Sequence, residues 1–433
     1  MSALRRAAVN VAAPALLRTQ ARAVSVSAAA ASPASAASAA PSNALRPLPG
    51  QTAHGTDNPL MGGLGVSALA RPAGRQSVSG IVATVFGCSG HLGRYVVNHL
   101  GRIGSQVITP YRSIDGMNVR HLKLAGDLGQ IVPIPVDIAD MDSVRRAVAR
   151  SNVVINLIGS RYETHHYSFD DVHAKIPYRL AQVSKAMGVE RFIHVSAVGA
   201  DAKSDSDLFR SKAAGEEAVK NFYPDATIIR PTVLFGPVDR FLAYYAYMAK
   251  HLAAIPMTQG GQRQVEPVFV GDVALAIMNS IADPAARGKT YELGGTKVFT
   301  EQEIIDLTAK HTVQNIRTFN MPDSVARLYG SIVGGRRDLS WLAESGLIGA
   351  PTIAALASKL SFPSVFNADM VAQKHTDLVS SRRFPGLDAL GVQHPVTLEA
   401  EIERILAAHR AEPLDHFPEA EIMKRDAKDN ASF

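Results

Sequence analysis

Residues 78–95 read VSGIVATVFGCSGHLGRY, and this stretch determines the expected fold. It joins a short apolar run, residues 81–86, to three glycines at GxxGxxG spacing, Gly87, Gly90 and Gly93. Apolar residues with helical spacing follow. A strand, a glycine turn and a helix in this order place backbone N–H groups and a helix N-terminus against a pyrophosphate. The stretch therefore predicts a dinucleotide-binding site, with a tight strand–helix turn that binds nothing as the alternative.

Short apolar strands and helices alternate from this stretch as far as Pro231. The further strands are expected at residues 106–111, 129–136, 153–158, 192–195 and 226–230. The helices are expected at residues 91–103, 142–149, 176–187 and 211–222, the second of them opened by an aspartate cap. Strands that are apolar throughout are typical of a parallel sheet covered on both faces. The pattern predicts the α/β class, a doubly wound parallel sheet with a small C-terminal helical lobe.

The regular alternation loosens after Pro231. Helices are expected at 241–252 and 271–281, strands at 265–270 and 290–293, and a helical pattern with Gly/Pro breaks from 300 to about 408. Tyr244, Tyr245 and Tyr247 lie on one expected helix, which we predict to pack within the second lobe. A contact of this helix with a partner subunit or lipid is the alternative. Trp341 is expected in a core, with a membrane-interface or partner-facing segment as the alternative.

The beginning of the chain differs in composition from the rest. Residues 1–50 contain five arginines and no acidic residue, and so carry five of the six net positive charges. They are rich in Ala and Ser, and residues 1–22 can form an amphipathic helix, which is typical of a mitochondrial transit peptide. A chloroplast transit peptide and a disordered tail are the alternatives. We expect a leader within residues 1–50, with no assigned cleavage site, and a linker to residue 76.

The remainder of the chain lacks the sequence signals of several kinds of function. Its net charge is nearly neutral. Nucleic-acid binding loses its electrostatic basis, because no basic footprint remains outside the leader. Cys88 is the single cysteine, so neither an internal disulfide nor a CxxC zinc site can form. No uninterrupted apolar run of about 18 residues is present, so no transmembrane helix is expected. The His- and Asp-containing stretch 161–173 is expected to be a polar loop, and no metal site is predicted.

The end of the second strand bears on the choice between NAD and NADP. An acidic residue about 20 positions beyond the glycine loop would bind the ribose 2′-hydroxyl and select NAD. Here the strand ends in Tyr111 and Arg112, and the first carboxylate is Asp115. An arginine can pair with a 2′-phosphate, so we expect NADPH, with a solvated surface arginine as the alternative. Asp137, after the third strand, has two open roles, a contact with adenine or a turn.

A serine and a lysine follow the later strands. Ser196 ends the fifth strand, and Lys212 lies 16 residues further on. Together with GxxGxxG, NLIG (156–159) and HVSAVGA (194–200), this order resembles the extended and atypical short-chain dehydrogenase/reductase superfamily. The resemblance implies that active members use the serine to polarise a carbonyl and a tyrosine four residues before the lysine to transfer a proton. Here Leu208 stands in the tyrosine's place. No catalytic residue is therefore expected, whereas Lys212 keeps a role on the cofactor ribose.

Five segments carry a closer resemblance. They are SGIVATVFGCSGHLGRYVVNHLGRIGSQVI (79–108), SNVVINLIG (151–159), GVERFIHVS (188–196), FGPVDRF (235–241) and FPGLDALG (384–391). Together they resemble the short-chain-dehydrogenase-like accessory subunits of mitochondrial respiratory complex I, the 39 kDa-type subunits of the NADH:ubiquinone oxidoreductase alpha subcomplex. The resemblance runs from about residue 77 to residue 410 and weakens between 300 and 374.

The resemblance implies both a location and a role. The location is the matrix side of the mitochondrial inner membrane, in contact with other complex I subunits near the ubiquinone-binding region and the membrane arm, with a peripheral lipid contact as a further option. The role is to hold NADPH tightly as a structural cofactor and to support assembly and stability. A soluble mitochondrial NADPH-dependent reductase or epimerase, which would need another proton donor, and an NADPH-sensing regulatory protein are the alternatives.

The expected domains and site residues complete this interpretation. An NADPH-binding Rossmann domain is expected at 77–298, a smaller C-terminal lobe at 299–410 and a loose tail at 411–433. The residues expected to hold the cofactor are Gly87, Ser89, Gly90, His91, Leu92, Gly93, Arg112, Asp137, Ile138, Leu157, Ile158, Gly159, Ser196, Lys212, Pro231 and Val233.

Overall fold

The chain divides into two units, Met1–Thr56 and Asp57–Phe433. The computed structural model describes parts of the second unit, namely residues 79–112, 117–164, 166–251, 254–314, 316–322 and 368–410. The expected leader and linker, the expected tail and Trp341 lie outside the described residues.

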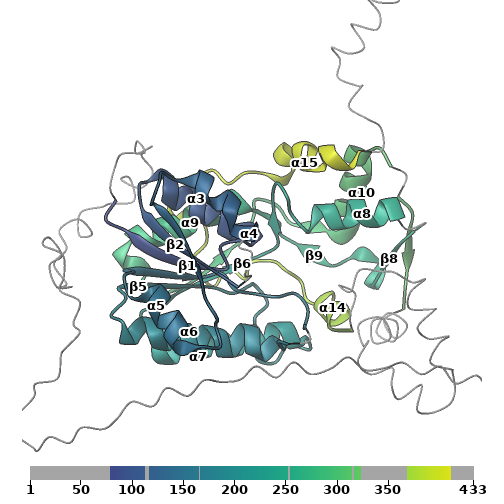
Figure 1. Ribbon diagram of the computed structural model, residues 1–433. Helices are drawn as coiled ribbons and strands as arrows, with labels where there is room; N and C mark the ends of the chain where they lie inside the picture. The colour runs from purple at the N-terminus through teal and green to yellow at the C-terminus, as the bar shows by residue number, and fades with distance from the viewer. Residues whose placement is uncertain are drawn as a thin grey trace, which may run out of the picture. The chain divides into compact units, whose positions relative to one another are not determined.

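Seven parallel strands form the central sheet, in the order β11-β6-β5-β4-β1-β2-β3 (Figure 1). The strands are β1 (Val82–Phe86), β2 (Gln106–Tyr111), β3 (Ile131–Pro135), β4 (Val153–Asn156), β5 (Arg191–Val195), β6 (Thr227–Pro231) and β11 (Thr290–Leu293). The chain starts in the middle at β1, winds outward through β2 and β3, and then returns to wind the other way from β4. This is a doubly wound sheet, and the predicted fold class is confirmed.

Helices cover both faces of this sheet (Figure 1). On one face lie α3 (His91–Arg102) and α9 (Val270–Ala282), and on the other lie α5 (Met141–Val148), α6 (Ile176–Ala186) and α7 (Asp207–Phe222). Successive residues of a strand point to opposite faces. Val85 of β1 therefore packs in the hydrophobic cluster with α3 and α9, and Phe86 packs in the cluster with α5 and α6. This two-sided burial explains why the strands are apolar throughout.

The structure corrects the boundaries of two expected elements. Helix α7 begins at Asp207 rather than Ser211, so Leu208 lies within the helix. The strand expected at 265–270 is two short strands, β9 (Gln264–Val265) and β10 (Val268–Phe269), because the chain changes partners between them. Strand β9 pairs with β12 (Phe299–Thr300), whereas β10 pairs with β7 (Leu234–Phe235).

The aspartate cap expected at the start of α5 is Asp140. Its carboxylate accepts hydrogen bonds from the backbone N–H groups of Asp142 and Ser143 at 3.0 and 3.2 Å. The cap therefore lies two residues before the position that the pattern indicated.

A second hydrophobic core joins segments from both sides of residue 298. It contains α8 (Leu242–His251), α10 (Glu301–Thr312) and α15 (Leu398–Leu406), with β8 (Ile255–Met257) beside β13 (Thr318–Asn320). Tyr245 is buried in this core, as expected for a helix that packs within the lobe. Tyr247 of the same helix is 44% exposed.

The remaining elements are short. They are α4 (Met117–Arg120), α14 (Ala368–Gln373), the 3-10 turns His121–Ala125, Gln259–Gly261, Pro284–Ala286, Asp388–Leu390 and Ala407–His409, and a π-helical turn at Asp171–Lys175. Among the helices in the described ranges, none combines the length and the apolar character needed to cross a membrane.

Candidate functional site

The centre of the sheet is the point where the direction of winding reverses. Strands β1 and β4 lie side by side there, and their carboxyl ends lead into loops that separate to opposite sides. Ligands of open α/β sheets bind at such a switch point, outside the carboxyl ends of the strands. The GxxGxxG loop follows β1, and the NLIG segment follows β4. The two predicted backbone motifs therefore meet at this point.

The glycines of the first loop are required by close backbone contacts. Gly87 has a φ of +80°, and a Cβ atom there would lie 2.8 Å from the carbonyl carbon and oxygen of Leu157. A Cβ atom at Gly93 would lie 2.4 Å from the carbonyl oxygen of Gly87. The backbone N–H of Gly90 donates to that same oxygen at 3.0 Å, which closes the turn. The glycine spacing thus serves the packing of β1, β4 and α3.

The first turn of α3 is left open for an anion. Gly90 is its N-cap residue, no side chain caps the helix, and the first turn contains no acidic residue. The leading N–H groups of a helix have no partner within it, and the helix dipole favours negative charge there. Leu92 is buried in the core, so only its backbone can face a ligand, whereas Ser89 is exposed. These features match a pyrophosphate site.

Arg112 and Asp137 lie where the sequence placed them, just after β2 and β3. Arg112 is exposed, and its guanidinium carbon lies 6.0 Å from the centroid of the Tyr167 ring. Asp137 accepts a hydrogen bond from the backbone N–H of Ala139 at 2.9 Å, which is the turn role. Ile138 packs against the cluster below the sheet. The adenine contact of Asp137 stays a prediction.

The segment after β4 is held by its own polar side chain. Asn156 is fully buried; its Oδ1 accepts from the N–H of Ile158 at 3.1 Å, and its Nδ2 lies 3.1 Å from Nδ1 of His194. Burial, as the main cause, lowers the pKa of His194 to about 4. Gly159 leaves space, since a Cβ there would come no nearer than 3.8 Å to His173. The backbone of residues 157–159 is thus fixed at the switch point.

Ser196 and Lys212 come together as the spacing predicts. The Lys212 Nζ donates to the carbonyl oxygen of Ser196 at 3.4 Å. Burial lowers the pKa of Lys212 to about 8; the charge of Glu216 opposes this shift, and that of Arg161 adds to it. The Ser196 hydroxyl is buried and has no hydrogen-bond partner among the described residues. A buried hydroxyl without a partner is uncommon, and a bound ligand would satisfy it.

Leu208 occupies the position one helical turn before Lys212. Its side chain is 7% exposed and packs with Phe169, Phe209 and Leu378. The side chain one helical turn before Lys212 therefore lies in a small apolar cluster.

Pro231 and Val233 follow the next strand. Pro231 ends β6 and is buried beside Leu293 of β11. Val233 is partly buried against the core of the second lobe, and its carbonyl accepts from the N–H of Val268 at 2.9 Å. These two residues carry the chain from the sheet into the second lobe at the same edge.

His173 is a site residue whose role the sequence pattern did not reveal. Its Nε2 accepts from the backbone N–H of Ser160 at 3.1 Å, and its Nδ1 donates to the hydroxyl of Ser211 at 3.0 Å. Burial is the main cause that lowers its pKa to about 3, so the ring is neutral. His173 thereby connects the loop after β4 to α7. Within the described residues, no three His, Cys, Asp or Glu side chains form a group that could hold a metal.

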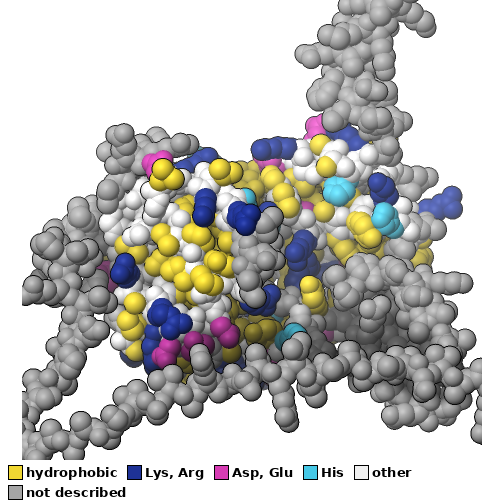
Figure 2. All heavy atoms as spheres, in the orientation of Figure 1, with side chains coloured by type: hydrophobic (Ala, Val, Ile, Leu, Met, Phe, Trp, Pro, Cys, Tyr) yellow, Lys and Arg dark blue, Asp and Glu magenta, His cyan; other side chains and the backbone are white. Residues whose placement is uncertain are grey.

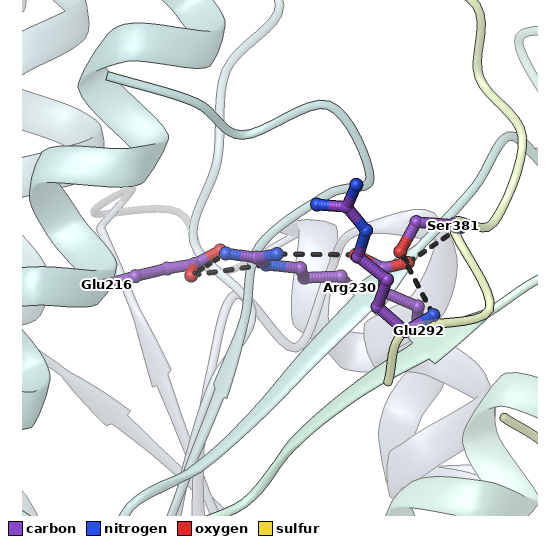
Figure 3. Close-up of polar contacts among 5 residues, drawn as sticks. Glu216, Arg230, Glu292 and Ser381 are labelled. Carbon is purple, nitrogen blue, oxygen red and sulfur yellow. Dashed lines mark hydrogen bonds and ion pairs between the residues drawn. The ribbon is translucent and has the colours of Figure 1, made fainter. Parts of the chain in front are cut away.

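A buried ion network fixes α7 to the sheet (Figure 3). Arg230 on β6 donates to Glu216 from Nε at 2.9 Å and from Nη2 at 2.7 Å, and its Nη1 lies 3.3 Å from Glu292 on β11. The other oxygen of Glu292 accepts from the N–H and hydroxyl of Ser381, at 2.8 and 2.6 Å. Burial opposes the charge of Arg230, but the two carboxylates outweigh it and raise its pKa. The network adjoins the site through Glu216, one turn beyond Lys212, and through Pro231.

The sequence and the structure are similar to known proteins. The NAD dependent epimerase/dehydratase family model matches residues 83–294. The mitochondrial NADH dehydrogenase [ubiquinone] 1 alpha subcomplex subunit 9 of Mus musculus is 42% identical over 337 residues, which cover 78% of this chain and 82% of that protein. The protein of the same name from Arabidopsis thaliana is 41% identical over 358 residues, covering 80% and 85%.

Solved structures share the fold at low identity. The triphenylmethane reductase of Citrobacter sp. superimposes with a TM-score of 0.53 at 18% identity, over 75% of this chain and 99% of that chain. At this identity the likeness concerns the fold alone.

Proposed function

The chain belongs to the family of the mitochondrial NADH dehydrogenase [ubiquinone] 1 alpha subcomplex subunit 9 proteins, and from this premise we propose that it is an accessory subunit of mitochondrial respiratory complex I. Residues 1–50 would then act as the transit peptide. The expected location is the matrix side of the inner membrane, beside other complex I subunits near the ubiquinone-binding region and the membrane arm. The family's names and the composition of the leader support the mitochondrial part.

We propose further that the subunit holds NADPH as a structural cofactor. The support is the open first turn of α3 against the glycine loop, the unpartnered Ser196 hydroxyl beside Lys212, and an arginine after β2. The residues that would hold it are those at the carboxyl edge of the sheet, from Gly87 to Val233. A ligand that binds only the folded chain stabilises it by about 4 kcal/mol when present at about a thousand times its dissociation constant.

The observation that carries the non-catalytic role is Leu208. An alkyl side chain has no proton to transfer, and Leu208 packs with the apolar side chains of Phe169, Phe209 and Leu378. The second candidate, an NADPH-dependent reductase, is favoured by the lowered pKa of Lys212 and by the epimerase/dehydratase match. It predicts oxidation of NADPH in the presence of a carbonyl substrate, and turnover of this kind by the purified chain would favour it over the structural role.

Native gel separation of solubilised mitochondria, followed by immunodetection of this chain, tests membership of the complex. We expect the chain to migrate with the large NADH-oxidising band. Migration at the mass of a monomer or dimer would overturn the proposal.

The structural role of the cofactor can be separated from folding by a pair of variants at Gly90. Its φ is negative and a Cβ there would lie 3.2 Å from the Gly87 oxygen, so Gly90→Ala and Gly90→Asp meet the same contact. Only Gly90→Asp places a carboxylate where the phosphate is expected. We expect it alone to lose bound NADP(H), measured on released nucleotide, and to lower the amount of assembled complex. Normal assembly without nucleotide would show that the cofactor is not structural.

A further inference from the structure

Residues 374–387, which we call the strap, follow α14 and connect the second lobe to the sheet (Figure 1). Leu378 forms a parallel bridge with Val265 of β9. The N–H of Leu378 donates to the carbonyl oxygen of Gln264 at 2.9 Å, and the N–H of Glu266 donates to the carbonyl oxygen of Leu378 at 3.0 Å. Polar and apolar contacts both hold the strap, and side chains of both kinds lie together in the middle of the face drawn in Figure 2.

Buried polar groups anchor the end of the strap in the second lobe. Lys374 pairs with Glu301 at 2.9 Å, and the same carboxylate oxygen accepts from the Tyr245 hydroxyl at 2.9 Å. All three side chains are buried. The Nε of Arg263 donates to the carbonyl oxygen of Thr376 at 3.0 Å. This end of the strap is therefore fixed to α8 and α10 by Tyr245 and Glu301.

Two buried carboxylates hold the strap at the sheet. Ser380 donates its N–H and its hydroxyl to Glu266, each at 2.8 Å. Ser381 donates the same two groups to Glu292 of β11, at 2.8 and 2.6 Å (Figure 3). The carbonyl oxygen of Pro385 accepts from the N–H of Glu292 at 3.1 Å, so the strap also pairs with the outer edge of β11. Loss of a donor to a buried carboxylate is costly, because water does not replace it freely.

The middle of the strap packs against the loop after β5 and the first turn of α7. Leu378 belongs to the apolar cluster that contains Leu208 and Phe209 of α7. A Cβ atom at Gly199, in the loop after β5, would lie 3.5 Å from side-chain atoms of both Leu378 and Thr376. The strap thus touches two segments that are separate in the sequence and adjacent in space.

These two segments carry the polar pair at the carboxyl edge of the sheet. Ser196 opens the loop after β5, and Lys212 lies on α7 one helical turn after Leu208. The chain before the strap contacts α7 as well, since Asp369 of α14 accepts from the N–H of Asp207 at 2.7 Å. The strap and α14 together therefore cover the start of α7 beside this pair.

We propose that the strap closes the side of the cofactor site next to Ser196 and Lys212, so that a nucleotide binds there without a second substrate. Ligands of open α/β sheets bind outside the carboxyl ends of the strands, and the strap lies in that region at β5 and β11. A site closed in this way excludes the carbonyl compound that a reductase needs. The presence of a nucleotide rests on the proposed function, whereas the closure by the strap does not.

The test measures the access of a small reagent to position 208 in the purified full-length chain. Leu208→Cys places a thiol under the strap, and N-ethylmaleimide is the probe. Arg150→Cys gives the rate at an open position, because Arg150 is exposed after α5. The native Cys88 is buried, and burial raises its pKa to about 11, so it reacts slowly. We expect Leu208→Cys to be labelled at least about a hundredfold more slowly than Arg150→Cys, as for a position reached only by local opening.

Ser380→Ala and Ser381→Ala weaken the strap without altering position 208. Each removes one hydroxyl bond to a buried carboxylate, which changes the equilibrium for opening by about tenfold. Ser280→Ala is the matched control, because it removes a buried hydroxyl bond within α9, made at 2.7 Å to the carbonyl oxygen of Ile277. In the Leu208→Cys chain, we expect each strap variant to raise the labelling rate about tenfold and the control to leave it unchanged.

Two results overturn the closure. One is a Leu208→Cys chain that is labelled as fast as Arg150→Cys. The other is a pair of strap variants that raise the labelling rate no more than Ser280→Ala does. NADPH binding is measured separately, so a wild type that binds no NADPH contradicts the proposed cofactor and leaves the labelling result to decide the closure.

Hydrogen exchange tests the strap if Leu208→Cys does not fold. It uses the chain with Leu208 in place and follows the N–H groups of Leu378, Ser380 and Ser381, which donate within the fold. Slow exchange that both strap variants accelerate supports a closed strap. Exchange at the rate of an unfolded chain overturns it.

Discussion

The glycine loop after β1 and the ion network at β6 and β11 lie at the same edge of one sheet, and they use opposite chemistry. The loop depends on glycines without side chains, which allow the backbone atoms of Gly87, Gly93 and Leu157 to approach closely. The N–H groups at the start of α3 are not capped by a side chain. The network consists of long charged side chains that pair with one another, as Arg230 does with Glu216.

The difference shows which part of the edge is open to a ligand and which part is structural. Free N–H groups at the start of α3 need an outside partner, whereas the network of Arg230 has its partners within the chain. Substitutions in the loop should therefore alter cofactor binding, whereas substitutions in the network should alter the free energy of unfolding of the cofactor-free chain. The five predictions below test this division, in decreasing order of expected effect.

Arg230→Met should have the largest effect on folding. It leaves Glu216 and Glu292, with side chains only 4% and 6% exposed, without their cationic partner. Breaking a buried pair in this way costs about 3–5 kcal/mol of the free energy of unfolding, measured by chemical denaturation. Arg145→Met is the control, because its pair with Asp142 is exposed and should contribute at most about 1 kcal/mol. Equal losses in the two variants would contradict a structural role for the network.

Gly93→Ala should come next. Its Cβ would lie 2.4 and 2.7 Å from the carbonyl oxygens of Gly87 and Cys88, so the loop and α3 must move apart. Overpacking of this kind costs about 1–3 kcal/mol. Gly386→Ala is the control at the same edge, since its Cβ would meet only the Glu292 carbonyl, at 3.7 Å. A cofactor-free Gly93→Ala chain as stable as Gly386→Ala would show that the close contact is not needed.

Lys212 should make cofactor binding depend on pH. With a pKa of about 8 in the cofactor-free chain, it loses its positive charge as the pH rises through that value, and attraction for the anionic cofactor falls. Bound cofactor favours the charged form, so the fall in affinity should lie somewhat above pH 8. As the pH increases, we expect the Kd of NADPH to rise in the wild type and to stay constant in Lys212→Gln. The Kd is measured between pH 6 and 10, a range of about four units around the pKa of Lys212.

The same pKa has the opposite effect on stability. An unfolded lysine titrates near about 10.4, so between about 8 and 10.4 the unfolded chain holds the proton that the folded chain has released. The free energy of unfolding of the cofactor-free chain should therefore gain a contribution from Lys212 as the pH rises through this window. If the free energy of unfolding of Lys212→Gln increased equally over this pH window, another group would be its cause.

Arg112→Gln should have the smallest effect and alter only selectivity. Arg112 is exposed and its guanidinium lies over the Tyr167 ring, so the cofactor-free chain should keep its stability. Loss of a contact with the 2′-phosphate should weaken NADPH by about tenfold, and NADH, which lacks that phosphate, should bind as before. Comparison of the two Kd values measures this. An equal change for both cofactors would remove the reason to prefer NADPH.

Sequence reasoning predicted the fold well because its signals are local. The apolar strands, the glycine spacing and the Ser196–Lys212 pair each depend on residues close in the chain or on strand ends that a parallel sheet brings to one edge. It placed the start of α7 at Ser211, one turn too late, because the helix begins at Asp207 with a turn that contains Leu208. It also joined β9 and β10, because the apolar pattern does not reveal a change of pairing partner.

The sequence by itself therefore determined the parallel sheet, the expected dinucleotide edge and the leucine that lies four residues before Lys212. Only the tertiary structure decided which polar groups are partners. Arg230 pairs with Glu216, 14 residues away in the sequence, and with Glu292, 62 residues away. Ser381, which donates to Glu292, lies 89 residues from it in the sequence. Charged side chains carry no periodic signal for a distant partner, so their pairing follows from the packing of the sheet and the second lobe.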